Sequence, residues 1–223
     1  MVAPKEILRR ETAHGRLVAV AVDEACTVES LLPEERAIAE TRAELVRPAF
    51  VAGRRALRAA LGVPAVAPIV HDDRGAPTLP EGWVGSISHK ATVALAVARR
   101  ADGARVGVDV ELPRPGRIDI SRRVLTDEEL AEVQGAEEGA RSAFTLRRFS
   151  MKEAIYKAID PFLRRYVGFR EVRLDEVDHA YAVRFVAPRA GEPALDVSAR
   201  IDLVDTELGP ILVSTALARL AGA

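Results

Sequence analysis

This sequence of 223 residues has a single cysteine, no long apolar run and almost no excess of one charge sign. The single cysteine, Cys26, excludes an intramolecular disulfide framework and fits a reducing compartment. No run of about 18 apolar residues occurs, which excludes a membrane-spanning helix. The charged N-terminus lacks the apolar segment of a secretory signal. We therefore expect a cytoplasmic protein with no membrane association.

Several familiar motifs are also missing. The sequence has no Walker pattern, nucleophile elbow, H-E-x-x-H helix or dinucleotide-binding glycine fingerprint. His14, His71 and His179 are scattered and lack the spacing of metal ligands. The formal net charge of −1 gives no global argument for binding nucleic acid, so we expect no nucleic-acid partner.

The pattern of apolar residues predicts an α+β protein with helices and strands mixed along the chain. Helices are expected over 31–61, with a break near Pro48, and over 140–159, ending before Pro161. A loop-rich segment covers 62–85, and Thr126 with Glu129 predicts a capping box. Strands are expected over 16–22, 92–98, 106–112, 167–174, 180–186, 197–204 and 211–218. A turn near residues 102–103 would join the second and third strands, and 113–116 would close this pair.

Two acidic residues stand out in the strand expected over 106–112. Valine at every second position places Asp109 and Glu111 together on the opposite face, roughly 6.5 Å apart along the strand. Two carboxylates this close repel each other unless a cation or a shared proton lies between them. Mg²⁺ commonly takes one or two carboxylates and completes its shell with water and phosphate oxygens. The alternative is a solvated edge strand with two surface acids.

A second candidate cluster lies on the helix expected over 140–159. Glu153 and Lys157 are four residues apart and share a face, while Lys152 projects about 100° away. The common alternative is a stabilising surface pair. A third candidate is the segment 85–90, read as a loop before a strand, in which Ser88 and His89 could cradle a phosphate; otherwise they are ordinary polar surface groups.

The stretch 42–58 adds an excess of arginine, including Arg47 and Arg54. An acidic pair, a Lys-Glu-x-x-x-Lys helix, a Ser-His segment and an arginine-rich helix would together make a Mg²⁺-assisted site for a polyphosphate. Each feature by itself is weak. Their combination favours a phosphate-handling enzyme.

The combination resembles the surfactin-synthetase-activating (Sfp-type) 4′-phosphopantetheinyl transferases, including their siderophore-synthesis branch. The signature blocks of that family match residues 107–111 (GVDVE) and 149–157 (FSMKEAIYK). Residues 74–77 followed by 85–89 resemble an earlier block, and residues 47–54 resemble a helix of the siderophore branch. The resemblance spans about 47–157, with Phe149 standing where many members have tryptophan.

The resemblance implies the transfer of the phosphopantetheine arm of coenzyme A to a serine of an apo acyl or peptidyl carrier protein in secondary metabolism. It implies a monomer of two similar α+β halves, a coenzyme A-binding half at 1–104 and a metal-binding, catalytic half at 105–223, with the site in the cleft between them. Asp109, Glu111 and Glu153 would hold Mg²⁺, and Glu153 and Lys157 would be catalytic. The coenzyme A phosphates would be bound by Arg47, Arg54, Arg74, Ser88, His89 and Lys152. The candidates for contact with the acidic carrier are Arg122, Arg123 and residues 162–166; the alternative for the last stretch is a loop that packs its aromatic side chains under the C-terminal sheet.

Two other functions stay open at this point. A Mg²⁺-dependent nucleotide phosphohydrolase would turn over nucleotides without any carrier protein. A non-catalytic module would only hold coenzyme A or a carrier protein. The complete set of Asp109, Glu111, Glu153 and Lys157 argues against the second alternative, because degenerate relatives usually lose at least one site residue.

Overall fold

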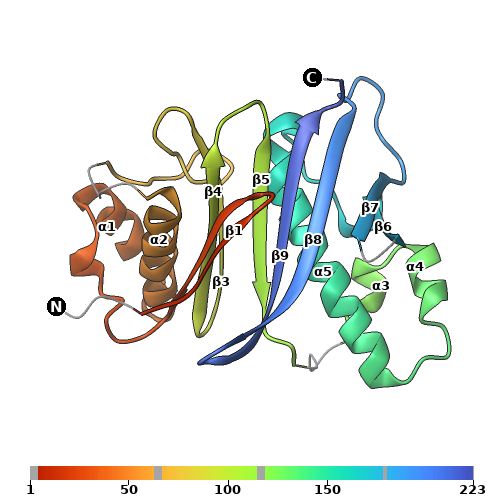
Figure 1. Ribbon diagram of the computed structural model, residues 1–223, viewed down its shortest axis with the longest axis horizontal. Coiled ribbons are helices and arrows are strands. Elements are labelled where there is room, and N and C mark those ends of the chain that lie inside the picture. Colours follow the sequence, from red (N-terminus) through yellow and green to blue (C-terminus); the bar gives the residue numbers. More distant parts are fainter. Residues whose placement is uncertain (1–4, 63–66, 115–118, 178–179, 223) are drawn as a thin grey trace. The chain divides into compact units, whose positions relative to one another are not determined.

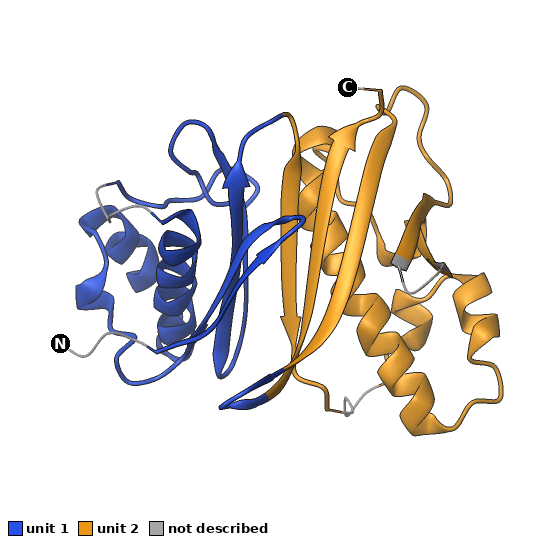
Figure 2. Ribbon diagram, in the orientation of Figure 1, with its two compact units in different colours: residues 1–102, 205–209 blue, residues 103–204, 210–223 orange. Residues whose placement is uncertain are grey.

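The protein was analysed as a computed structural model that describes residues 5–62, 67–114, 119–177 and 180–222. These residues form two compact units, one of residues 1–102 with 205–209 and the other of residues 103–204 with 210–223 (Figure 2). Each unit contains one antiparallel sheet and its own helices (Figure 1), so the α+β class predicted from the sequence is confirmed. The similarity of the two halves and a cleft between them stay predictions.

The first unit is built on a four-stranded sheet in the order β1-β2-β4-β3. Its strands are β1 (Glu6–Thr12), β2 (Gly15–Ala21), β3 (Trp83–Lys90) and β4 (Val93–Arg100). Strands β2 and β4 are apolar on both faces and supply the core, with Val18, Leu95 and Ala96 fully buried. The sequence did not predict strand β1, because its residues are largely charged and exposed and show little alternation of apolar with polar side chains.

Helices of the first unit divide the predicted segment 31–61 into short pieces and one longer helix. The pieces are α1 (Pro33–Glu40), η2 (Glu44–Val46) and α2 (Arg47–Leu61), and η1 (Val28–Ser30) lies just before the predicted segment. The interruption precedes Pro48, which lies in the first turn of α2, where its missing N–H would have no helical partner in any case. Helix α2 ends at Gly62 with φ 68°, a left-handed conformation that glycine adopts without strain.

The segment 85–90 is not the loop predicted from its glycine and serines. It belongs to β3, whose residues pair with β4 throughout, Ser88 opposite Leu95 and His89 opposite Ala94. Pairing with a buried neighbouring strand overrides the low strand propensity of glycine and serine. Gly85 is required for this pairing, because a Cβ there would lie 2.7 Å from the carbonyl oxygen of Val97.

The second unit has a five-stranded sheet in the order β5-β9-β8-β7-β6. Strand β5 (Arg105–Glu111) pairs with β9 and lies in a different sheet from β4, so the predicted hairpin of these two strands is wrong. The sequence pattern located both strands, but it could not show whether they pair in one sheet or belong to two different sheets. The remaining strands are β6 (Val172–Val177), β7 (Ala180–Phe185), β8 (Leu195–Thr206) and β9 (Gly209–Leu220).

Helices α3 (Ser121–Val124), α4 (Asp127–Glu132), α5 (Glu138–Leu163) and η3 (Phe169–Glu171) complete the second unit. The capping box is confirmed: the Glu129 N–H donates to Thr126 Oγ1, and the Thr126 N–H donates to Glu129 Oε2. Helix α5 continues through Pro161, beyond the predicted end at 159. Met151, Ile155 and Ile159 on this helix form the centre of the core of the unit.

Some expectations fall on residues outside the described part of the chain, namely residues 63–66 of the predicted loop, residues 115–116 of the segment expected to close the strand pair, and His179. Within the described residues, no helix is long and apolar enough to cross a membrane.

Candidate active site

The face of β5 that carries both acids packs against α5. A Cβ on Gly107 would lie only 1.9 Å from the carbonyl oxygen of Ala154 and 2.8 Å from the backbone nitrogen of Ala158. Helix and strand backbones therefore approach more closely than any residue except glycine would permit. Residues two and four positions along a strand share its face, so Asp109 and Glu111 lie on the same side as Gly107.

Lys157 links the two signature blocks directly. Its Nζ donates to the carbonyl oxygen of Val108 over 2.8 Å and contacts Asp109 Oδ1 at 3.3 Å. Helical side chains point toward the N-terminus of their helix. The Lys157 side chain therefore extends back along α5 and contacts Val108 and Asp109, the residues that follow Gly107 on β5. The side chain of Asp109 is only 7% exposed, whereas that of Lys157 is 27% exposed. The acid is thus enclosed by the protein, while the lysine side chain stays partly exposed.

The alternative of a solvated edge strand with two surface acids is wrong, because Asp109 and Glu111 are both buried, although β5 does lie at the edge of its sheet. Glu153 is half-buried on α5, one turn before Lys157. Among the residues that the structure describes, no three His, Cys, Asp or Glu side chains are already gathered to hold a metal ion. Mg²⁺ needs only one or two carboxylates when water and phosphate oxygens complete its shell. The hard oxygen donors of β5 therefore fit this ion.

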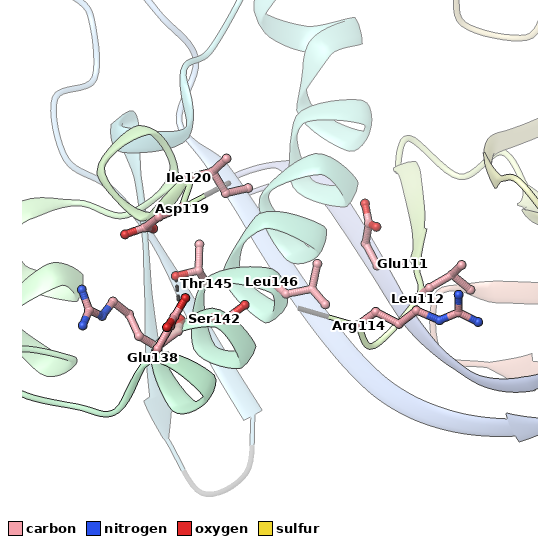
Figure 3. Close-up of a pocket in the computed structure, with 10 residues that line it drawn as sticks. Glu111, Leu112, Arg114, Asp119, Ile120, Glu138, Ser142, Thr145 and Leu146 are labelled. Carbon is pink, nitrogen blue, oxygen red and sulfur yellow. Dashed lines mark hydrogen bonds between the residues drawn. The ribbon is translucent and has the colours of Figure 1, made fainter. Parts of the chain in front are cut away.

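A pocket of about 390 Å³ opens beside Glu111 in the second unit (Figure 3). Its wall combines apolar side chains with charged and hydroxyl groups. It is lined by Glu111, Leu112, Arg114, Asp119, Ile120, Glu138, Arg141, Ser142, Thr145 and Leu146. Glu111 thus borders a space that can admit water or a ligand. The other lining residues could not be predicted from local sequence patterns, because they come from separate segments brought together by folding.

Lys152 lies in a different environment from its neighbours in the signature block. Its side chain is 1% exposed, and its Nζ contacts Glu129 Oε2 at 2.5 Å and the Val124 carbonyl oxygen at 3.0 Å. Burial lowers the pKa of Lys152, and the hydrogen bond that Lys152 donates to Glu129 opposes that shift. Binding a phosphate, as the resemblance implies, would require this internal ion pair to break.

Arg54, in the first unit, is also buried. Its Nε donates to the Ile69 carbonyl oxygen over 2.8 Å, and its guanidinium lies 4.1 Å from the centre of the Phe50 ring. Burial lowers the pKa of Arg54 to about 10, so the group stays charged at neutral pH. The neighbouring Glu35 accepts a hydrogen bond from the Ile69 N–H. Arg54 thus helps to attach the segment around Ile69 to α2.

The other predicted phosphate ligands of the first unit are more accessible, except Ser88. Arg47 is half-buried and donates to the carbonyl oxygens of Glu40 and Arg42, whereas Arg74 and His89 are exposed. Asp109, Glu111, Lys152, Glu153 and Lys157 belong to the second unit. The structure joins Asp109 to Lys157 by a direct contact, while the convergence of the full set on one site stays a prediction.

Comparison with known proteins assigns both units. A model described as the 4′-phosphopantetheinyl transferase superfamily matches residues 105–197, and one for the 4′-phosphopantetheinyl transferase N-terminal domain matches residues 33–99. The transferase Svp of Streptomyces mobaraensis is 31% identical over 167 residues, covering 72% of this chain and 68% of that protein. The chain belongs to the 4′-phosphopantetheinyl transferase superfamily.

Other relatives match shorter parts of the chain. The transferase PptT of Mycobacterium tuberculosis is 35% identical over 151 residues, which span 64% of each protein, slightly under two thirds of that relative's length. Component D of enterobactin synthase from Salmonella typhi is 39% identical over 110 residues, covering 48% of this chain and 44% of that protein. The family match extends beyond the region 47–157 that carried the resemblance, on both sides.

Proposed function

We propose that this protein transfers the 4′-phosphopantetheine group of coenzyme A to a serine of an apo acyl or peptidyl carrier protein. The observation that carries the proposal is the contact between Asp109 and Lys157, because it unites the two signature blocks at one point on β5 and α5. The carrier serine oxygen forms a bond to the phosphorus next to the pantetheine. The pyrophosphate P–O bond breaks, and 3′,5′-adenosine bisphosphate leaves.

Glu153 accepts the proton of the incoming serine in this proposal, directly or through a water molecule. It is half-buried on α5, one turn from Lys157, so it can be reached from solvent. Lys157 stabilises the negative charge that develops on the phosphates, since its side chain is partly exposed and its ammonium lies beside the buried Asp109. Asp109, Glu111 and Glu153 would hold Mg²⁺, whose charge would offset that of the pyrophosphate when bound.

The first unit would supply the remaining contacts to coenzyme A. Arg47, Arg74 and His89 are the accessible candidates, and arginine suits a multiply charged phosphate because its planar donors bind two oxygens at once. We propose that the protein acts as a monomer in the cytosol, where the free thiol of Cys26 would stay reduced. Equilibrium sedimentation tests the monomer, and a mass near twice that of the chain would contradict it.

Intact mass spectrometry of an apo carrier protein, incubated with coenzyme A and Mg²⁺, tests the activity. We expect the carrier to gain one phosphopantetheinyl group and the gain to disappear with a chelator. Asp109→Ala, Glu153→Gln and Lys157→Ala should each slow transfer by about 100-fold or more, as for loss of a group that stabilises a transition state. Asp196→Ala, the same change at an exposed position on β8, is the matched control and should transfer normally.

Three outcomes would overturn parts of the proposal. Unshifted carriers of both acyl and peptidyl type would remove the transferase function. Hydrolysis of nucleotides without a carrier would favour a phosphohydrolase, and tight coenzyme A binding without any turnover would favour a binding module. Unchanged transfer by the Asp109→Ala variant would remove the role of β5 in the site.

A further inference from the structure

A buried ion pair in the second unit takes no part in the proposed chemistry. Lys152 and Glu129 are 2% and 0% exposed, and their charged atoms are 2.5 Å apart. Removing two charges from water is costly and is repaid only where the surrounding polar groups are also satisfied. A lysine that served only to keep the protein soluble would lie on the exposed surface of the helix.

Glu129 meets that condition because its carboxylate joins three elements. Oε2 accepts hydrogen bonds from the Thr126 N–H at the start of α4 and from Lys152 on α5. Oε1 accepts a hydrogen bond from the Leu174 N–H on β6 over 3.0 Å. Lys152 adds a bond to the Val124 carbonyl oxygen at the end of α3. The pair therefore connects α3, α4 and β6 to one position on α5.

That position directly precedes Glu153. Consecutive residues of a helix are separated by about 100° around its axis. With Lys152 fixed in the interior, the rotation of this turn sets the direction in which Glu153 projects. Lys157, four residues after Glu153, shares its face and depends on the same rotation.

We propose that Lys152 is a positioning residue that acts through Glu129 to fix the rotation of α5, and that it is not a ligand of the coenzyme A phosphates. This inference rests on the proposed function for its catalytic consequence. Its structural part, the coupling between Lys152 and Glu129, stands without any substrate. The two roles predict different behaviour when both partners are changed together.

The experiment is a double-mutant cycle with Lys152→Met, Glu129→Gln and the combined variant. Glutamine has the same shape as glutamate but keeps only one of the two oxygens that accept from the Thr126 and Leu174 N–H groups, so Glu129→Gln carries a cost of its own; methionine fills the volume of the lysine stem. Lys5→Met is the matched control, since it breaks an exposed ion pair with Glu207. The readouts are the urea midpoint, kcat, and the KM for coenzyme A.

Lys152→Met alone should lower the urea midpoint and reduce kcat between about 10-fold and 100-fold, the range expected when a reacting group is displaced by about 1 Å. The KM for coenzyme A should change by less than about threefold, because ground-state phosphate binding is not lost. The combined variant should lose less midpoint and kcat than the sum of the two single losses, since neither Lys152 nor Glu129 is then left as a buried charge without the other. Recovery should be incomplete, because buried Arg148 also lies 3.6 Å from Glu129 and would keep only its ion pair with Glu132 at 3.7 Å. Lys5→Met should match the wild type in all three readouts.

A phosphate ligand would behave differently. The KM for coenzyme A would rise about tenfold or more in Lys152→Met and would stay high in the combined variant, which would overturn the proposal. Additive changes in the urea midpoint would overturn it as well, even if transfer occurred. If the wild type modified no carrier, the proposed function would fail, whereas coupling in urea would still support the structural part.

Discussion

Replacing Gly107 by alanine perturbs the candidate site through its backbone. The new Cβ would meet the Ala154 carbonyl oxygen at 1.9 Å, whereas ordinary contacts begin at 3.4 Å. Helix α5 must therefore recede from β5 by about 1.5 Å. The obstructing atoms belong to the backbone of a long helix, so no rotation of a side chain relieves the overlap.

This displacement of α5 should affect both the stability of the protein and the rate of transfer. Overpacking of this kind costs about 1–3 kcal/mol of unfolding free energy, and backbone obstruction places Gly107→Ala at the upper end, near 3 kcal/mol. The recession would also stretch the contacts of Lys157 with Asp109 and the Val108 carbonyl oxygen, now 3.3 and 2.8 Å long. A displacement of about 1 Å can cost about 100-fold in rate, so transfer should fall by at least that factor.

Urea denaturation and the carrier-modification assay check these two figures. Gly139→Ala is the matched control, because it lies on α5 and a Cβ there meets nothing within 4 Å. This control should keep full activity, with stability unchanged or raised by up to about 1 kcal/mol from the better helix propensity of alanine. A Gly107→Ala protein as stable and active as the wild type would refute the argument from close packing.

Two further predictions concern stability alone. Phe50→Ala should lower the free energy of unfolding, measured with urea, by about 3–5 kcal/mol. The reason is that this buried ring packs in the core of the first unit and is contacted by two guanidinium groups. A loss under about 1 kcal/mol would contradict that role. The pKa of Glu192 is lowered to about 2, mainly by its hydrogen bond with Arg165. The charged carboxylate therefore stabilises the fold above its ordinary pKa of 4.5, and this stabilisation is lost as the pH falls toward 2. Urea midpoints should therefore fall between pH 5 and 2, and less steeply in Arg165→Met; identical slopes would exclude this ion pair as a source of the acid sensitivity.

Local patterns predicted the part of the site that lies on single elements. Alternating valines placed Asp109 and Glu111 on one face of a strand, and helical spacing placed Glu153 and Lys157 on one face of a helix. Both statements depend only on residues close in sequence. The mode of packing between the two elements was not predicted, although Gly107 carried the signal for a close approach.

Features set by distant partners could not be predicted in this way. The segment containing Ser88 has a turn-like composition and forms a strand only because β4 pairs with it. Lys152 occupies a position typical of exposed helix residues, and its burial depends on Glu129, 23 positions earlier in the chain. Lysine burial of this kind requires a partner that no periodicity reveals.

The turn between β8 and β9 has a consequence for the order in which the chain is made. Residues 205–209 belong to the first unit, and Glu207 forms an ion pair with Lys5 near the opposite end of the sequence. Domains usually fold as units during synthesis, beginning with the N-terminal one. Because residues 205–209 follow most of the second unit along the chain, the first unit cannot be completed before most of the second has been synthesised. A fragment ending at residue 102 would lack this turn, so the two halves cannot be separated by a single cut in the gene.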